Sequence, residues 1–471
     1  MTVIQGDHPV RQDAEPCDGT VCMSDAIAQM KQTARHPFVR AVAALQVGSF
    51  GARFVSAITG LILARLLGPA GFGAYALLYA FASLLNLLQE VGVGTSTVNL
   101  LSRAYATRER SQVVEVLRNF TRVQVIILFT TGLGGAIAAP WLAQWWYGNP
   151  MLGWLASVAV MTVALQFFGP LLSTALQVSS RAPALASFEL ASRIGQSAIV
   201  LTLVGLGAGI PGVVFGQLIA MALTSMVAAV GYRRLQRQEL LLPTVRELFR
   251  APSPRGSLRR FFTFSLQVAL DKNLANLNAT LPILIFGALM ANPETLGQYK
   301  VAFAVATLPT MLLAPISRML ASQFPMTERF GERTLLQRFF QVGGLSFALT
   351  FAQAAVLGVL GPWVIRLLYG PAYEPAVSLM SVLLPYAVII SAGVGIGPMF
   401  RTLNRMGVII VINLVATLTL VGAALALIPT AESFGLAATM LIGATVPTGL
   451  ALLYLGWRLR RLRQVPVSIP E

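Results

Sequence analysis

The 471-residue chain is poor in charged residues, which make up only 11% of it, roughly half of their share in an ordinary soluble domain. Hydrophobic residues make up 56%, and the mean hydropathy is +0.71. A water-facing monomer of this size needs a polar shell that so few charges cannot supply. The composition therefore excludes a soluble enzyme and indicates a membrane protein.

Cysteine, histidine and lysine are also scarce, and each scarcity removes a class of chemistry. Both cysteines and both histidines lie in the polar first 36 residues, too few for a disulfide framework or a metal site. None of the three lysines, Lys31, Lys272 and Lys300, follows a glycine, so the chain has no phosphate-binding P-loop. Neither a Gly-x-Ser-x-Gly elbow nor a His-Glu-x-x-His helix occurs. We expect no enzyme activity, no cofactor and no metal.

Apolar stretches long enough to cross a bilayer follow one another after the polar tail. About 20 apolar residues in a helix span the ~30 Å hydrocarbon core, and backbone inside lipid must pair within its own segment. The sequence thus predicts an all-α polytopic membrane protein with about twelve transmembrane helices. The expected spans are 41–67, 72–93, 120–146, 151–179, 184–206, 211–232, 261–289, 298–321, 339–368, 376–400, 407–428 and 435–457.

Arginines occur in every second break between these spans. The even-numbered breaks and the C-terminal end carry them, whereas the odd-numbered breaks read GPAG, YGNP, GLGAGIP, MANPETLG, YGPAYEP and IPTAESFG, without Lys or Arg. By the positive-inside rule, the arginine-rich breaks and both termini are cytoplasmic. The net charge of +16 then reflects orientation and contact with anionic membrane lipids, and no nucleic-acid partner is expected.

The two halves of the chain match at an offset of about 223 residues, which indicates a duplication. Six spans per half predict parallel repeats, with a substrate cavity between two six-helix lobes. The expected domains are a polar tail (1–37), an N-lobe (38–232), a basic linker (233–260), a C-lobe (261–463) and a second tail (464–471). The matching pairs are Tyr147 and Tyr369, Gly73 and Gly297, Tyr75 and Tyr299, Arg181 and Arg405, and Gly212 and Gly435.

Ionisable side chains at bilayer depth cost ~2.5–3.5 kcal/mol each, so they are candidates for function. Arg53 lies about twelve residues into the first span, without a nearby acid, which favours a place in the cavity. Glu189 and Arg193 are one turn apart on the fifth span, a spacing that suits either an ion pair for packing or a functional pair. Lys300 opens the eighth span and either faces the cavity or anchors at the interface.

Two groups of candidate residues follow. Asn273 and Asn276 could hydrogen-bond sugars or hold helices together. The substrate-binding candidates are Arg53, Lys272, Lys300, Arg193, Asn273 and Asn276, and the candidates for ion coupling are Asp271 and Glu189.

The sign of the intramembrane charges bears on the cargo. Cations outnumber acids at depth, whereas an exporter of cationic drugs would concentrate carboxylates. The planar guanidinium fork of arginine suits phosphate oxygens. A cargo with an anionic headgroup is therefore favoured.

Three stretches resemble the polysaccharide-transport flippases of the multidrug/oligosaccharidyl-lipid/polysaccharide exporter superfamily. They read LARLLGPAGFGAY at 63–75, LGQY at 296–299 and YGPAY at 369–373. The resemblance implies two six-helix lobes in a V and a flippase for undecaprenyl-pyrophosphate-linked oligosaccharides. Such a protein works by alternating access in the bacterial inner membrane, in the synthesis of O-antigen, exopolysaccharide or capsule. It also implies that Arg53 matches a first-span arginine in the central cavity, and that other polysaccharide assembly proteins are candidate partners.

Two other functions stay open at this point. One is a cation-coupled multidrug exporter of the same superfamily. The other is a non-transporting membrane scaffold of a polysaccharide assembly complex, which would use the arginine-rich loops as docking surfaces.

Overall fold

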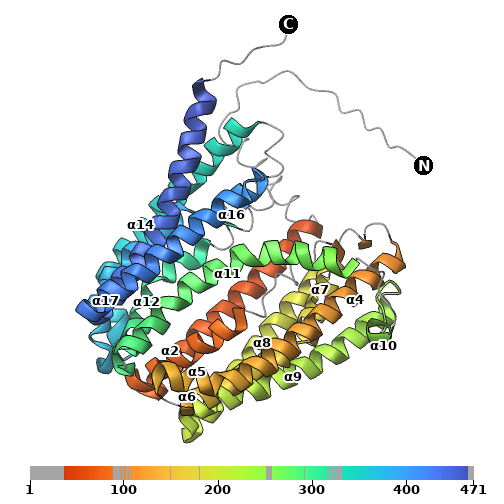
Figure 1. Ribbon diagram of the computed structural model, residues 1–471, viewed down its shortest axis with the longest axis horizontal. Coiled ribbons are helices and arrows are strands. Elements are labelled where there is room, and N and C mark those ends of the chain that lie inside the picture. Colours follow the sequence, from red (N-terminus) through yellow and green to blue (C-terminus); the bar gives the residue numbers. More distant parts are fainter. Residues whose placement is uncertain are drawn as a thin grey trace, which may run out of the picture.

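The computed structural model describes residues 37–87, 108–148, 150–179, 181–250, 257–290, 292–313 and 331–464, with single positions between 97 and 105 and between 316 and 324. Every regular element in these ranges is a helix (Figure 1). The predicted all-α membrane fold is confirmed. The two cysteines, the two histidines and Lys31 lie outside the described residues.

The helices follow the two predicted halves of the chain. Those of the first half are α2 (Pro37–Leu87), α4 (Arg110–Ile127), α5 (Gly134–Tyr147), α6 (Pro150–Ala164), α7 (Phe168–Val178), α8 (Ala182–Leu203), α9 (Gly209–Gln238) and α10 (Val245–Arg250). Those of the second half are α11 (Ser257–Met290), α12 (Pro293–Ala306), η3 (Leu308–Leu312), α14 (Glu332–Leu368), η5 (Pro371–Tyr373), α15 (Ala376–Ala392), α16 (Ile396–Thr402) and α17 (Met406–Gln464).

Three helical runs are too long for one membrane crossing. The 51-residue α2 and the 59-residue α17 would extend ~75 and ~90 Å as straight helices, against a hydrocarbon core of ~30 Å. Each run breaks where the backbone takes a positive φ: α2 at Gly68 (67°), α8–α9 at Gly207 (89°), and α17 at Glu432 (44°). Each therefore holds two of the predicted spans.

The remaining spans are single helices or pairs of shorter ones. The third span is α4 with α5, the fourth is α6 with α7, the eighth is α12 with η3, and the tenth is α15 with α16, while α11 and α14 cross alone. Of the described residues, six helical runs are long and apolar enough to cross a membrane, and shorter apolar helices accompany them. Twelve spans in two lobes account for all of these helices.

The lobes share one hydrophobic core at one end and have separate cores at the other. The shared cluster contains Leu78 and Phe81 of α2 together with Phe286 of α11 and Val301 of α12. Two further clusters each belong to one lobe. One contains residues in the range from Leu101 to Leu248 of the N-lobe, and the other contains residues in the range from Leu313 to Leu455 of the C-lobe. The lobes therefore form a V that is closed at the shared core (Figure 1).

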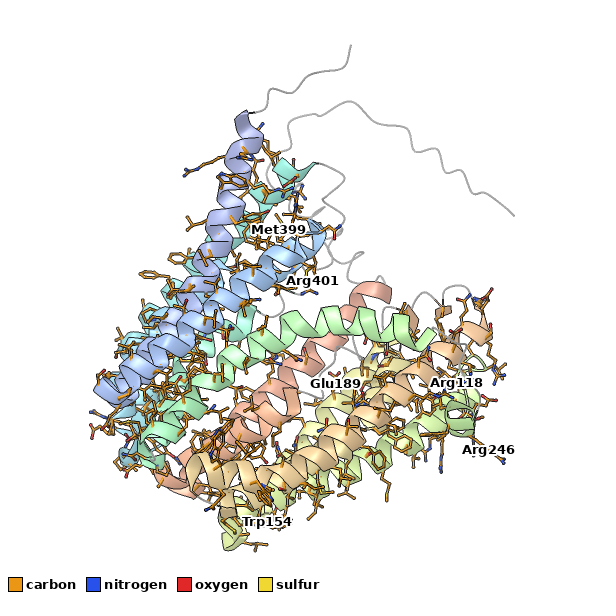
Figure 2. All side chains as sticks on the ribbon, viewed as in Figure 1. Arg118, Trp154, Glu189, Arg246, Met399 and Arg401 are labelled. Atoms are coloured by element: carbon orange, nitrogen blue, oxygen red, sulfur yellow. The ribbon has the colours of Figure 1, made fainter. Side chains whose placement is uncertain are left out.

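The open end of the V carries the arginine-rich segments. Figure 2 shows Arg118 and Arg246 near the tip of the N-lobe and Arg401 near the tip of the C-lobe, with Trp154 at the opposite end of the N-lobe. The closed end is thus the end of the arginine-free breaks. The cytoplasmic position of the arginine-rich breaks stays a prediction from charge.

The closed end depends on two glycines that the internal repeat had matched. A Cβ placed on Gly73 would lie 1.6 Å from the carbonyl oxygen of Pro293, and one on Gly297 would lie 2.0 Å from that of Pro69. Each proline precedes its glycine by four residues. The kink of α2 and the start of α12 therefore meet backbone to backbone in a two-fold arrangement.

Two further hydrogen bonds join the lobes beside this glycine contact. The Tyr373 hydroxyl donates to the carbonyl of Ala64 (2.8 Å), and the Arg65 guanidinium donates to the carbonyl of Leu367. All of these groups belong to the stretches 63–75, 296–299 and 369–373 or lie next to them. The stretches that carried the family resemblance build the closed end.

The segment expected to be a linker, 233–260, is partly folded onto the N-lobe. Helix α9 continues to Gln238, and α10 packs against α4 through the Arg110–Glu247 ion pair (3.2 Å). Thr244 and Glu247 exchange hydrogen bonds as a capping box (2.9 and 3.1 Å), which holds the pKa of Glu247 below its usual value. Leu248 is fully buried. Residues 251–256 lie outside the described residues, and the domain boundaries stay a prediction.

Substituting Gly297 should open the closed end of the V. We expect Gly297→Ala to speed labelling of a cavity cysteine, Leu61→Cys, severalfold, because the added methyl group would clash with the Pro69 backbone. The measurement is the rate of modification by a membrane-impermeant maleimide added on the side of the arginine-free loops, in a Cys17→Ser, Cys22→Ser background.

Gly195→Ala is the matched control, because a Cβ there meets nothing within 4 Å. Equal labelling rates in Gly297→Ala, Gly195→Ala and the parent protein would contradict a closed end sealed by backbone contact.

Candidate functional site

A cavity of about 650 Å³ lies between the lobes. Helices α2 and α8 of the N-lobe form one wall, and α12, η3 and α14 of the C-lobe form the other. Most of its lining is apolar, for example Leu61, Phe72, Val305, Met311 and Val364. Its volume is in the range of small-molecule and cofactor pockets.

Close packing of α2 on α8 places two arginines in this cavity at the same depth. A Cβ on Gly48 would lie 2.6 Å from the Cβ of Ala186. Further along, Thr59 donates to Ser197 (2.7 Å). The two helices therefore run parallel in constant register, which puts Arg53 and Arg193 within ~3 Å of each other along the helix axes.

Arg53 and Arg193 are the only charged side chains among the described residues that line the cavity. Both are exposed to it. The Arg193 guanidinium also donates to the side-chain oxygen of Gln196 one turn on (3.0 Å), which holds it in place. An apolar cavity that presents two guanidinium groups favours an anion, and a phosphate above all.

A second, smaller pocket of about 350 Å³ continues from the cavity into the N-lobe. The two share Ala52 and Arg193, and the pocket adds Glu189 and several neutral polar side chains. Figure 2 shows Glu189 between the tip of the N-lobe and the closed end. The acid and the base predicted one turn apart thus line one pocket, and their ion pair stays a prediction.

The other candidates from the sequence are placed differently. Lys300 is half-buried on α12 and is not among the residues that line the cavity, whereas Val301, Ala304 and Val305 of the same helix are. On α11, Asn273 is half-buried and Asn276 is exposed, and neither lines the cavity.

The described part of α11 leaves two candidates untested. Asp271 and Lys272 lie on the helix, but their side chains are outside the described residues. Nearby, Asn278 accepts a hydrogen bond from Thr417 (2.7 Å) and lines a pocket of about 180 Å³ inside the C-lobe.

Sequence reasoning missed the polar residues of the N-lobe pocket. Ser192 and Gln196 lie on the face of α8 that carries Glu189 and Arg193, and Gln166 lies in the turn between α6 and α7. A signal was present, because residues 189, 192, 193 and 196 share one helical face by their spacing. Gln166 has no such periodic signal, since the break in the fourth span is visible only in the structure.

Residues 38–329 match the profile of a family described as "Polysaccharide biosynthesis protein". The chain belongs to this family. The match covers more than half of the sequence and includes the closed end, α2 and α8. No curated protein is detectably similar in sequence.

Solved structures of membrane transporters have the same fold. One is an inward-facing multidrug resistance MATE family transporter, with a TM-score of 0.71, 17% identity, and 88% of this chain and 96% of that one covered. Another is a superfamily transporter from Pyrococcus furiosus, described as having a binding pocket of reversed polarity, with a TM-score of 0.65, 18% identity and coverage of 90% and 96%. The outward-facing form of a MATE transporter gives a TM-score of 0.64 at 17% identity, with 90% and 96% covered. This chain, a member of the polysaccharide biosynthesis family, is thus a multi-pass membrane protein with a transporter fold.

A cavity with two arginines should bind a polyvalent anion. We expect millimolar inorganic pyrophosphate to raise the Tm of the purified protein by roughly 2–4 °C, because ligand binding stabilises the folded state. Arg53→Ala should lose this shift, as measured by thermal unfolding in detergent.

Arg401→Ala is the control, since Arg401 lies near the C-lobe tip (Figure 2) and donates to the carbonyl of Gly397. A pyrophosphate shift that survives Arg53→Ala, or one that Arg401→Ala also abolishes, would contradict an anion site in the cavity.

Proposed function

We propose that this protein flips undecaprenyl-pyrophosphate-linked oligosaccharides from the inner to the outer leaflet of the bacterial inner membrane, for the synthesis of surface polysaccharide. The observation that carries the proposal is the pair Arg53 and Arg193 in an otherwise apolar inter-lobe cavity. Membership of the polysaccharide biosynthesis family and the transporter fold support it.

The cavity suits an amphipathic cargo with an anionic head. Two guanidinium groups can bind the two phosphates, while Leu61, Phe72 and Val305 offer an apolar surface. Burying two like charges in a membrane is costly without a counter-charge. A doubly charged headgroup would supply that counter-charge, so the cavity favours an anion over a cationic drug.

The V corresponds to the loading state of this cycle. Its open end carries the arginine-rich segments, which the positive-inside rule assigns to the cytoplasm. A cargo that starts in the inner leaflet, as the proposal requires, would enter an inward-open cavity from that side. Parting the Gly73–Gly297 contact and bringing the open tips together would expose Arg53 and Arg193 to the other side.

Arg53→Ala is the first test in cells. We expect it to abolish surface polysaccharide at a normal protein level and to cause lipid-linked repeat units to accumulate, because the site that binds the headgroup loses half of its positive charge. Arg53→Lys should be intermediate, since lysine keeps the charge but not the planar fork. The measurement is extractable surface glycan and lipid-linked oligosaccharide in a deletion strain that expresses each variant.

Arg401→Ala should restore wild-type glycan in the same strain. Wild-type glycan in cells with Arg53→Ala would refute the headgroup site. Drug hypersensitivity of the deletion strain with intact glycan would refute the flippase in favour of a multidrug exporter. Glycan rescued in full by an Arg53→Ala, Arg193→Ala double variant would favour a scaffold.

A further inference from the structure

The internal repeat gives each lobe a corresponding pocket, and the two pockets differ at several matched positions. Counted from the match of Arg181 with Arg405, Gln166 corresponds to Ile390 and Gln196 to Leu420. All four residues line the pocket of their own lobe. The fold therefore builds the same hollow twice, at about 350 Å³ in the N-lobe and 180 Å³ in the C-lobe.

Three positions of the N-lobe pocket, Gln166, Ser192 and Gln196, are polar where the matching residue of the C-lobe is apolar, although the C-lobe pocket has polar residues of its own, such as Asn278, Asn413 and Thr448. Ser192 corresponds to the fully buried Ala416, and Arg193 corresponds to Thr417. Because the C-lobe keeps the same architecture with Ile390, Ala416 and Leu420 at these three positions, folding does not require Gln166, Ser192 and Gln196 to be polar. Polar groups at membrane depth are costly, so we infer that these three side chains serve something other than the fold.

Several of these polar side chains are available to a ligand. Within the described part of the chain, the side chains of Gln166, Ser192 and Ser225 take part in no hydrogen bond with protein. In contrast, other hydroxyls on these helices, such as those of Thr59 and Thr202, donate to the carbonyl one turn back. The break between α6 and α7, at residues 165–167, adds irregular backbone beside Gln166. Such backbone is tolerated at membrane depth where it lines a cavity.

The chemistry of the pocket fits a sugar ring. An amide side chain both donates and accepts hydrogen bonds, a serine hydroxyl does the same, and the Glu189 carboxylate accepts from hydroxyls. Apolar groups of Pro170, Phe188 and Met221 line the same pocket and can cover the C–H face of a pyranose. The volume of about 350 Å³ is at the small end of ligand pockets, which suits one sugar residue.

We propose that the N-lobe pocket binds the first sugar of the lipid-linked oligosaccharide, next to a pyrophosphate held by Arg53 and Arg193. The inference rests on the proposed function. The pocket opens from the cavity at Arg193 and Ala52, so a sugar joined directly to the pyrophosphate reaches it without leaving the arginines. The lobe that holds the sugar thereby distinguishes a glycosylated lipid from the bare carrier.

The test compares two lipids on the full-length protein in nanodiscs. The probes are undecaprenyl pyrophosphate and the same lipid with one N-acetylhexosamine attached. The variant is Gln166→Ile, Ser192→Ala, which gives the N-lobe pocket the residues of its C-lobe counterpart. We expect the wild type to prefer the glycosylated lipid, and the variant to lose about tenfold in affinity for it, as for two hydrogen bonds. Affinity for undecaprenyl pyrophosphate should change less than twofold, which also reports that the variant folds.

Thr448→Val, in the C-lobe pocket, is the matched control and should leave both affinities unchanged. If the variant binds both lipids as the wild type does, or weakens both equally, the sugar site is refuted while the proposed function stands. If the wild type binds neither lipid, the proposed function fails, and the sugar site with it.

Discussion

The backbone contact between Gly73 and Gly297 is the constraint on which this architecture depends. Because both residues are glycines and lack a Cβ, the kink of α2 and the start of α12 can approach so closely that neither position has room for a side chain. This approach forms one core shared by both lobes. Away from the closed end the two lobes separate, and each keeps its own core at its open end. Because this contact is small and two-fold symmetric, parting it would let rigid lobes move between two arrangements while each lobe keeps its own core.

The charged and polar side chains of the cavity make the two similar lobes unequal. The repeat supplies two lobes of one design, but the cavity arginines, Glu189 and the polar pocket all belong to the N-lobe. The C-lobe contributes mainly apolar wall, with Val301, Val305 and Val364. In the proposed function the two similar lobes move, and the side chains of the N-lobe bind the anionic, polar headgroup. The positive-inside rule predicts that the many arginines at the open tips orient the protein in the membrane.

The sequence predicted the spans and their grouping in lobes, and it singled out Arg53, which lines the cavity, because hydropathy and burial cost are local properties. It paired Gly73 with Gly297 as a repeat but gave no sign that they touch, since contact between lobes is tertiary. It likewise could not bring Arg53 and Arg193 together, because their common depth depends on Gly48 packing against Ala186. The sequence left Lys300 open between the cavity and the membrane interface, and in the structure it lies on the face of α12 that carries Ala304 but one turn closer to the closed end, where it does not line the cavity. Depth within one turn of helix is beyond what composition and spacing resolve.

Direct observation of lipid transfer tests the central claim. Purified protein would be reconstituted in vesicles with an undecaprenyl-pyrophosphate-linked oligosaccharide labelled on its sugar, and transfer between leaflets would be followed by the access of an external glycosidase. The account predicts transfer by the wild type well above that of protein-free vesicles, and none above that level by an Arg53→Ala, Arg193→Ala double variant. Equal transfer by the wild type and the double variant, or none by either, would contradict it.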